Sequence, residues 1–193
     1  MPDTGAPWNI PFLDGTELVR AYPDFSEDLA DAVADGLSAA GNAGIGSNVV
    51  STTKSNLFTT TSTSFTAVSD LEAIITPTTD TSQILIIGQI PMNYSAGSAG
   101  YFRLMNGATP IAIGDASGSR SRVTGGFSAF VASSYATQPF VFLHSPESTS
   151  AQTYSVEVRV SSGTLRVGTS GDDADNVNVG RSISTITAIE VAA

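Results

Sequence analysis

Beyond residue 48, much of the chain alternates between apolar and polar residues with a period of two, which is typical of half-buried β-strands. The clearest case is the segment 154–160, where every second residue is apolar and the residues between are polar. Leu165 and Val167 resume the pattern after the turn signal Ser162-Gly163, so a β-hairpin is predicted here. This pattern predicts an antiparallel sheet with one face in a core.

Two further segments, 84–87 and 140–143, are apolar on both faces. Strands of this kind must be covered on both sides, by a second sheet or by a neighbouring subunit. Shorter strand candidates, separated by turn residues, lie near residues 49–54, 57–61, 64–69, 71–76, 100–106, 109–113, 127–132 and 183–191. Many short strands without intervening helices predict that residues 47–193 form a mainly β head domain, an antiparallel β-sandwich or jelly roll.

The first 46 residues follow a different pattern and are predicted to form an N-terminal arm with one short helix. Prolines recur through residues 1–22 and favour an extended backbone. A short extended peptide cannot bury Trp8 by itself, so the arm needs a surface to lie on. That surface belongs either to its own head domain or to another protein, which would bind the arm through aromatic anchors.

One helix is predicted, at about residues 25–40. Asp24 and Glu27 have the spacing of a capping box, and Leu29, Val33 and Leu37 recur every four residues. This narrow apolar stripe suits packing on the helix's own sheet, on a flat partner, or in a short trimeric bundle. A glycine-rich joint at 41–48 follows and separates the arm, 1–46, from the head, 47–193.

Composition and charge restrict the possible partners. The 193 residues include 8 basic and 18 acidic side chains, a net charge of −10, and 41% are hydrophobic. The arm has eight acidic residues and one arginine, hence −7, and the head has ten acidic and seven basic residues, hence −3. So few basic residues form no phosphate-binding stripe, so nucleic acid is not an expected partner. Neither a signal peptide nor a membrane-spanning run is recognisable, so membrane insertion is not expected.

No cofactor, metal site or enzymatic activity is predicted. The absence of cysteine excludes disulfides and thiolate chemistry, and the chain has one histidine, His144, beside Ser145 and near Glu147. We interpret His144 as a structural residue. Ser51 and Lys54 match a Ser-x-x-Lys nucleophile pattern, but its partner motifs are absent. A carboxylate-based hydrolase is kept as a rival hypothesis, although no pair of carboxylates stands out.

Two loops offer other chemistry. The acidic loop contains Asp172, Asp173, Asp175 and Asn176, which we interpret as a solvated loop, with calcium binding as the alternative. Possible ligand contacts at loop tips are Tyr94, Tyr101, Arg120 and Arg122. Tyrosine and arginine among glycine and serine form an adaptable contact set, and the alternative is a plain surface loop.

Several of these segments resemble known proteins. The runs 6–11 (Ala-Pro-Trp-Asn-Ile-Pro), 14–20 and 28–37 resemble a leader found on virion proteins of phages of actinobacteria. The rest resembles the jelly-roll heads of tailed-phage fibre and decoration proteins, similar in style to the complement-globular and tumour-necrosis-factor fold. This second resemblance is carried by residues 58–61, 65–68, 154–160 and 182–191.

The resemblance implies a homotrimer on the surface of a virion, assembled in the bacterial host cytoplasm. The leader would attach to a capsid or tail protein through Trp8, Ile10, Phe12, Leu13 and Leu18. The head would then project as a capsid decoration (head fibre) subunit, which we slightly favour, or as a tail-fibre or tail-tip subunit that binds host-surface glycan. Threefold packing would cover the second face of 84–87 or 140–143.

Overall fold

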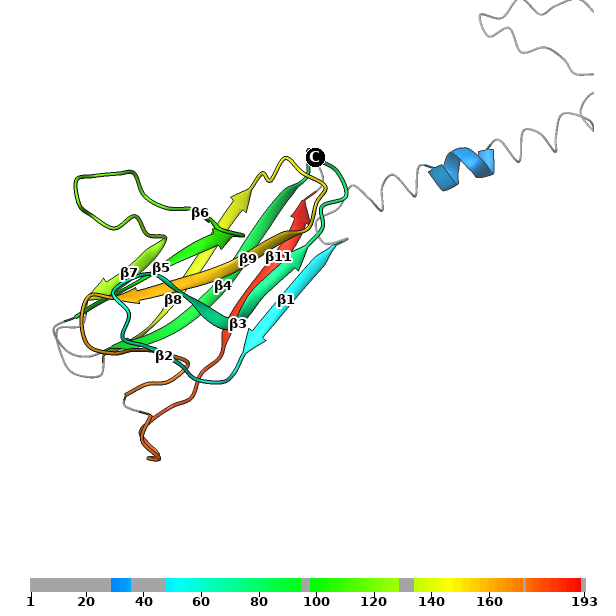
Figure 1. Ribbon diagram of the computed structural model, residues 1–193. Coiled ribbons are helices and arrows are strands. Elements are labelled where there is room, and N and C mark those ends of the chain that lie inside the picture. The colour runs from blue at the N-terminus through cyan, green and yellow to red at the C-terminus, as the bar shows by residue number, and fades with distance from the viewer. Residues whose placement is uncertain (1–28, 36–47, 95–97, 129–133, 172, 192–193) are drawn as a thin grey trace, which may run out of the picture. The chain divides into compact units, whose positions relative to one another are not determined.

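The structure is a computed structural model, and it describes residues 29–35, 48–94, 98–128, 134–171 and 173–191 (Figure 1). The chain divides into two units, Met1–Ala43 and Gly44–Ala193, and each is described by itself. The predicted boundary between residues 46 and 47, the joint as far as residue 47, and the anchor candidates all lie outside the described residues. The anchor candidates are Trp8, Ile10, Phe12, Leu13 and Leu18.

In the first unit, residues 29–35 form a helix, which confirms this stretch of the predicted helix. Leu29 and Val33 of the predicted stripe are both exposed. Leu37 and both predicted ends of the helix lie outside the described residues.

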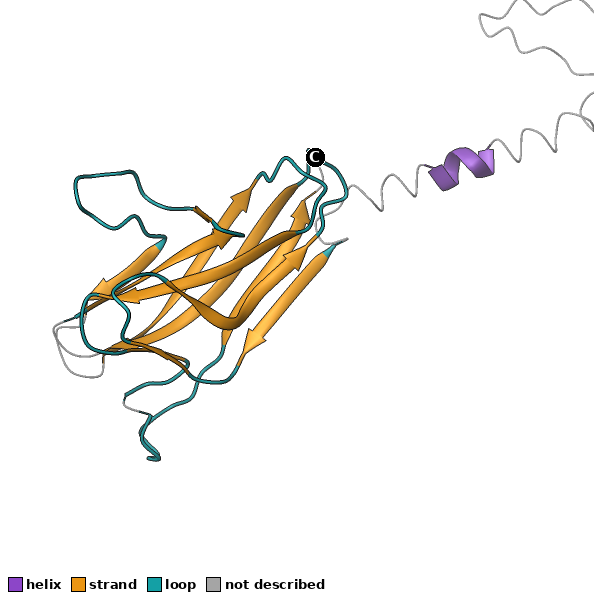
Figure 2. Ribbon diagram, viewed as in Figure 1, coloured by secondary structure: helices purple, strands orange, loops and turns teal. Residues whose placement is uncertain are grey.

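The second unit is built from β-strands (Figure 2). Their bounds are β1 Val49–Lys54, β2 Phe58–Thr60, β3 Thr66–Ile75, β4 Gln83–Tyr94, β5 Ala99–Asn106, β6 Thr109–Ile111, β7 Gly125–Ser128, β8 Ser134–His144, β9 Gln152–Val160, β10 Leu165–Val167 and β11 Ser184–Val191. All pairings between them are antiparallel.

The strands form two sheets packed face to face (Figure 1). Sheet A has the order β1-β11-β4-β10-β2, with β8 paired to the other side of β4; sheet B has the order β3-β9-β5-β6, with β7 also paired to β5. The chain crosses between sheets from β2 to β3, β3 to β4, β4 to β5, β7 to β8, β8 to β9 and β9 to β10. This repeated crossing is the topology of a jelly roll, so the predicted fold class is confirmed.

The core lies between the sheets and follows the alternation seen in the sequence. Tyr154, Val156, Val158 and Val160 of β9 are completely buried, and the polar residues between them point outward. They face side chains of β4 such as Ile86 in sheet A. The period-two prediction for 154–160 is therefore confirmed.

The predicted hairpin between 154–160 and 165–167 is wrong. β9 pairs with β3 and β5 in sheet B, whereas β10 pairs with β2 and β4 in sheet A. Gly163, with a φ of 71°, lies in the connection, which carries the chain across the sandwich. β11 pairs with β4 only as far as Gln89, so the far end of β4 has hydrogen-bonding groups for β10. A turn signal alone does not show which edge the next strand will occupy.

The predicted strands 64–69 and 71–76 form one strand, β3. Its register against β9 shifts between Ala67 and Glu72, and Asp70 at the irregularity has a φ of 60°. A β-bulge inserts extra residues without ending the strand. The polar pair at 69–70 therefore marks a bulge rather than a turn.

Candidate functional site

The outer surface of sheet A carries a face of aligned side chains, here called the apolar face. The strand registers place it in two rows across β1, β11, β4 and β8. The first row is Val49, Ile189, Leu85 and Leu143, and the second is Ser51, Thr187, Ile87 and Val141. Six of these eight side chains are aliphatic, and none is charged.

The aliphatic side chains of the apolar face remain accessible. Val141 is 68% exposed, Val49 50%, Leu143 46% and Ile87 39%. Strand β8 is also an edge strand, because β4 is its only partner among the described strands. Large contiguous apolar surface beside an open strand edge is typical of a protein-interaction site.

The apolar face comes from the two segments predicted to be apolar on both sides. Residues 84–87 and 140–143 lie on neighbouring strands, with Ile86 opposite Phe142 and Ile87 opposite Val141. Their inward side chains, such as Ile84 and Ile86, are covered by sheet B. Their outward side chains are not covered by any described part of this single chain. The second sheet therefore covers one face of these segments, and the other face is open in the single chain.

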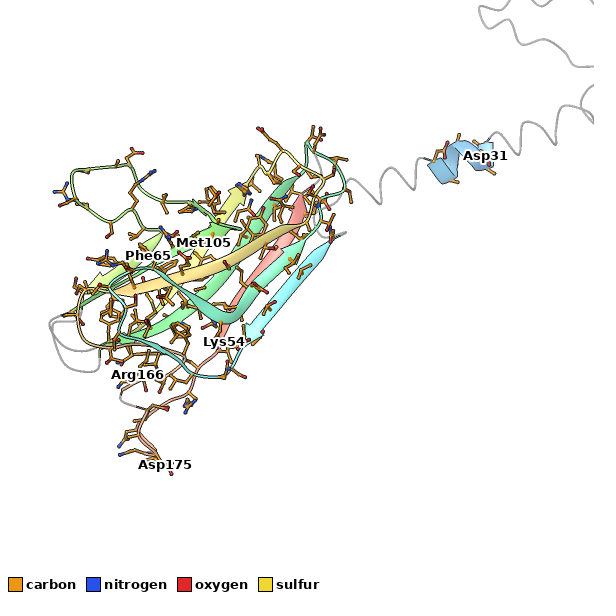
Figure 3. All side chains as sticks on the ribbon, viewed as in Figure 1. Asp31, Lys54, Phe65, Met105, Arg166 and Asp175 are labelled. Carbon is orange, nitrogen blue, oxygen red and sulfur yellow. The ribbon has the colours of Figure 1, made fainter. Side chains whose placement is uncertain are left out.

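The outer surface of sheet B is different and carries an arginine-aromatic cluster of Phe65, Tyr101, Arg103, Glu157 and Arg159 (Figure 3, where Phe65 is labelled). Cross-strand pairing positions it, because Tyr101 lies opposite Arg159 and Arg103 opposite Glu157. The Arg103 Nε and Nη2 atoms lie 2.7 and 2.6 Å from Glu157 Oε2, and the Arg103 Cζ atom lies 4.2 Å from the Phe65 ring centroid.

Arg159 lies between two aromatic rings. Its Cζ atom is 5.9 Å from the ring centroids of both Phe65 and Tyr101. Its Nη1 atom donates to Ser121 Oγ at 2.5 Å, and its buried Nε atom has no hydrogen-bond partner among the described residues. Arg159 therefore has a cation–π environment and one neutral acceptor, but no carboxylate partner in the described structure.

The four predicted ligand contacts are not brought together. Tyr94 is fully buried: its hydroxyl donates to the Phe127 carbonyl and burial raises its pKa, so its placement at a loop tip is wrong. Its strand alternation puts it on the inward side of β4. Tyr101 lies in the arginine-aromatic cluster. Arg120 and Arg122 are exposed and flank Ser121, the loop residue that contacts Arg159.

The cluster contains four residues that were not predicted as ligand contacts: Phe65, Arg103, Glu157 and Arg159. Arg159 was visible only as a polar position of an alternating strand. The opposite charges of Arg103 and Glu157 suit a cross-strand pair. Their sequence separation of 54 residues gives no register by itself, so the pairing could not be read from the pattern.

His144 has a structural environment. Its Nδ1 atom lies 2.9 Å from the Tyr154 hydroxyl, and its ring stacks on Phe142. Burial lowers the pKa of His144 and raises that of Tyr154 to about 12. Ser145 accepts a hydrogen bond from Gln83. These contacts favour the structural interpretation of His144.

The Ser-x-x-Lys match does not assemble into a nucleophilic pair. Ser51 points outward and shares a hydrogen bond with Thr187. Lys54, three positions further along the strand, is buried and donates to Asn56 Oδ1 at 2.6 Å. Residues separated by three positions lie on opposite faces of a strand.

The acidic loop surrounds a hollow of about 300 Å³ lined by Asp173, Asp175, Asn176 and Arg181, among others. Arg181 Nε lies 2.7 Å from Asp173 Oδ1, so one carboxylate already has a cationic partner. Asp172 lies outside the described residues. In the part of the chain that the structure describes, no group of three or more acidic, histidine or cysteine side chains could hold a metal ion. No described helix is long and apolar enough to cross a membrane.

Comparisons with known proteins give similarity at the level of structure only. No family model matches the chain, and no curated protein matches it. A structure of infectious bursal disease virus Gx strain aligns with a TM-score of 0.38 and 14% identity, over 77% of this chain and 37% of that chain. A structure of Eiger TNF from S. frugiperda aligns with a TM-score of 0.35 and 10% identity, over 77% of this chain and 93% of that chain.

Proposed function

We propose that this chain is a non-enzymatic structural subunit of a tailed-phage virion, and that it forms a homotrimer on the particle surface. The arm, residues 1–46, attaches the subunit to a capsid or tail protein, and the head projects outward. The phage context and the arm's role rest on the resemblance of the leader. We favour the capsid surface slightly, because the arm is short, the head is small, and no long shaft repeat separates the two.

The observation that carries the proposal is the apolar face. A chain with a net charge of −10 repels its own copies. Copies can approach most readily through a surface that lacks carboxylates, and the two rows of the apolar face have none. Sheet B offers no such surface, since Glu72, Arg103 and Glu157 lie on its outward side. The proposed trimer therefore places sheet A toward the threefold axis and sheet B toward solvent.

Burial of the apolar face would supply the association energy. Complete burial of a valine, leucine or isoleucine contributes roughly 1.5–3 kcal/mol relative to full exposure. The four most exposed side chains of the face are about half exposed in the single chain, with exposed fractions of 39–68%. Several such side chains on each of three subunits would become partly buried in the trimer. The unpaired backbone groups of edge strand β8 could form further hydrogen bonds there.

Size-exclusion chromatography with light scattering on the full chain tests this arrangement. Val141→Glu introduces a charge at the most exposed position of the apolar face and should convert a trimer into monomers. Ile74→Glu is the matched control, because Ile74 is 51% exposed but lies on β3 of sheet B. We expect this control to remain trimeric. A monomeric wild type, or equal behaviour of the two variants, would contradict the proposal.

The attachment role needs particles. A chain lacking residues 2–22 should still form trimers but should no longer load onto virions. Loading of this shortened chain would contradict the anchoring role. The alternative function is a tail-fibre or tail-tip subunit that binds host-surface glycan, which the arginine-aromatic cluster favours. Antibody labelling of particles in the electron microscope distinguishes the two locations, since label would gather on the capsid or on the tail.

A further inference from the structure

We propose that the arginine-aromatic cluster on sheet B binds the carboxylate of an acidic saccharide, with Arg159 as the anion-binding group and Tyr101 as the stacking surface. This inference goes beyond the structural role, and it names the ligand class and the site of the alternative glycan-binding function.

The first argument is charge. Arg103 and Glu157 form an ion pair at 2.6 Å and neutralise one another. Arg159 has no ion-pair partner among the described residues, although the chain has ten more acidic than basic residues. Arg120 and Arg122 flank Ser121 in the sequence, but their side chains donate to Ser117 and Gly114 within their own loop. Arg159 is therefore a cation without an acidic partner on an acidic protein, and such a group attracts anionic ligands.

The second argument is the hydrogen-bonding state of Arg159. A guanidinium offers five N–H donors in a planar fork that matches a carboxylate. Only the Nη1 atom of Arg159 has a hydrogen-bond acceptor among the described residues, Ser121 Oγ, and the buried Nε atom has none. A carboxylate that approaches along the fork would supply acceptors, after a small side-chain adjustment that opens Nε.

The third argument is the aromatic surface. Arg103 already covers the Phe65 ring at 4.2 Å, whereas among the described residues the one cation over the Tyr101 ring is Arg159, at 5.9 Å. On its other side Tyr101 lies opposite Gly126, which has no side chain to cover it. A Cβ atom at position 126 would lie 2.8 Å from Tyr101 Cδ1, so the ring extends over this glycine. A partly exposed ring next to an unpaired guanidinium suits a sugar ring that carries a carboxylate.

Saturation-transfer-difference NMR on the full chain tests the site with two probes, methyl β-D-glucuronide and methyl β-D-glucoside, which differ by the carboxylate. We expect saturable glucuronide binding in the millimolar range and binding of the glucoside at least about tenfold weaker. Arg159→Gln and Tyr101→Ala should each weaken glucuronide binding about tenfold or more. Arg181→Gln is the control, because Arg181 is paired with Asp173 away from sheet B, and it should bind like the wild type.

The proposal would be overturned if glucuronide binding did not saturate up to about 50 mM, because binding would then be too weak for a site. Equal signals from the two probes, or unchanged glucuronide binding by Arg159→Gln, would overturn it as well. If that variant does not fold, Arg159→Lys keeps the charge without the fork and should still bind several-fold more weakly. Wild-type affinity in Arg159→Lys would also overturn the proposal. The monomeric Val141→Glu chain should still bind glucuronide, so failure of the trimer and failure of this site are distinguishable.

Discussion

Glu190 is an acidic side chain that the sandwich buries almost completely, and its replacement by glutamine tests how the fold retains a buried charge. It lies on β11 and is 1% exposed. Its Oε1 atom accepts hydrogen bonds from the amide and hydroxyl of Thr78, both at 2.6 Å, and its Oε2 atom accepts one from Asn48 at 2.9 Å. The carboxylate thus ties the start of β1 and the β3–β4 connection to the last strand.

The stability that the Glu190 carboxylate contributes follows from its pKa. Burial raises the pKa of Glu190, but hydrogen bonds from Thr78, Ser82 and Asn48 outweigh burial and lower it from 4.5 to about 2. Because one pKa unit corresponds to about 1.4 kcal/mol, the folded state favours the charged form by about 3 kcal/mol. A lowered folded-state pKa stabilises the fold above pH 4.5, and this stability is lost as the pH falls toward 2.

Glu190→Gln keeps the shape but removes the charge, and its amide group must face a donor at Thr78 or Asn48. We therefore expect the variant to lose about 2–3 kcal/mol of unfolding free energy at pH 7. Urea denaturation of both chains at equal concentration, at several pH values between 7 and 2.5, measures this difference.

The pH dependence is the sharper part of the test. The difference between wild type and Glu190→Gln should shrink as the pH falls below about 4.5, because only the wild type loses a stabilising charge. Glu72→Gln, on the exposed side of β3, is the matched control and should change stability by less than about 0.5 kcal/mol. A difference that stays constant with pH, or one no larger than that of the control, would refute the reasoning.

Two further predictions concern side chains packed between the sheets. Burial lowers the pKa of His144 below 6.5, so the unfolded chain takes up a proton more readily than the folded chain, and stability should fall as the pH drops below about 6.5. His144→Phe should remove this part of the pH dependence in denaturation curves, and an unchanged pH dependence would contradict the prediction. Gly88→Ala would push a methyl group against the Phe140 ring and the Thr185 carbonyl and should cost about 1–3 kcal/mol. Gly114→Ala, which meets nothing within 4 Å, should leave the thermal midpoint unchanged, and equal midpoints for both variants would disprove the packing argument.

Local patterns anticipated much of the fold because they report burial directly. The alternation over 154–160 identified the buried side of β9, and the doubly apolar segments 84–87 and 140–143 predicted two strands with apolar residues on both faces, which are parts of β4 and β8. The same reasoning indicated the apolar face, since an outward row of aliphatic side chains has no cover within one sheet.

The errors concern which strand lies beside which, where one strand ends, and which side of a strand is buried. The predicted hairpin at 162–163 failed because β10 pairs along the free end of β4, and Tyr94 failed as a ligand contact because the same strand continues inward alternation to its end. The pairing of β10 is not encoded near its own residues, because it depends on an edge that distant segments create. The burial of Tyr94 is different, because Tyr94 continues the period-two series of Ile84, Ile86, Ile90 and Met92.

By itself, then, the sequence determined that residues 49–191 form strands rather than helices, which side of β9 is buried, and that the segments 84–87 and 140–143 are apolar on both sides. Only the tertiary structure decided that Tyr101, Arg159 and Phe65 meet on one surface, and that Glu190 is enclosed by Asn48 and Thr78. The physical reason is distance along the chain. Period-two patterns and turn preferences depend on residues that are neighbours in sequence, whereas ion pairs and cross-strand contacts require a strand register that the whole sandwich sets.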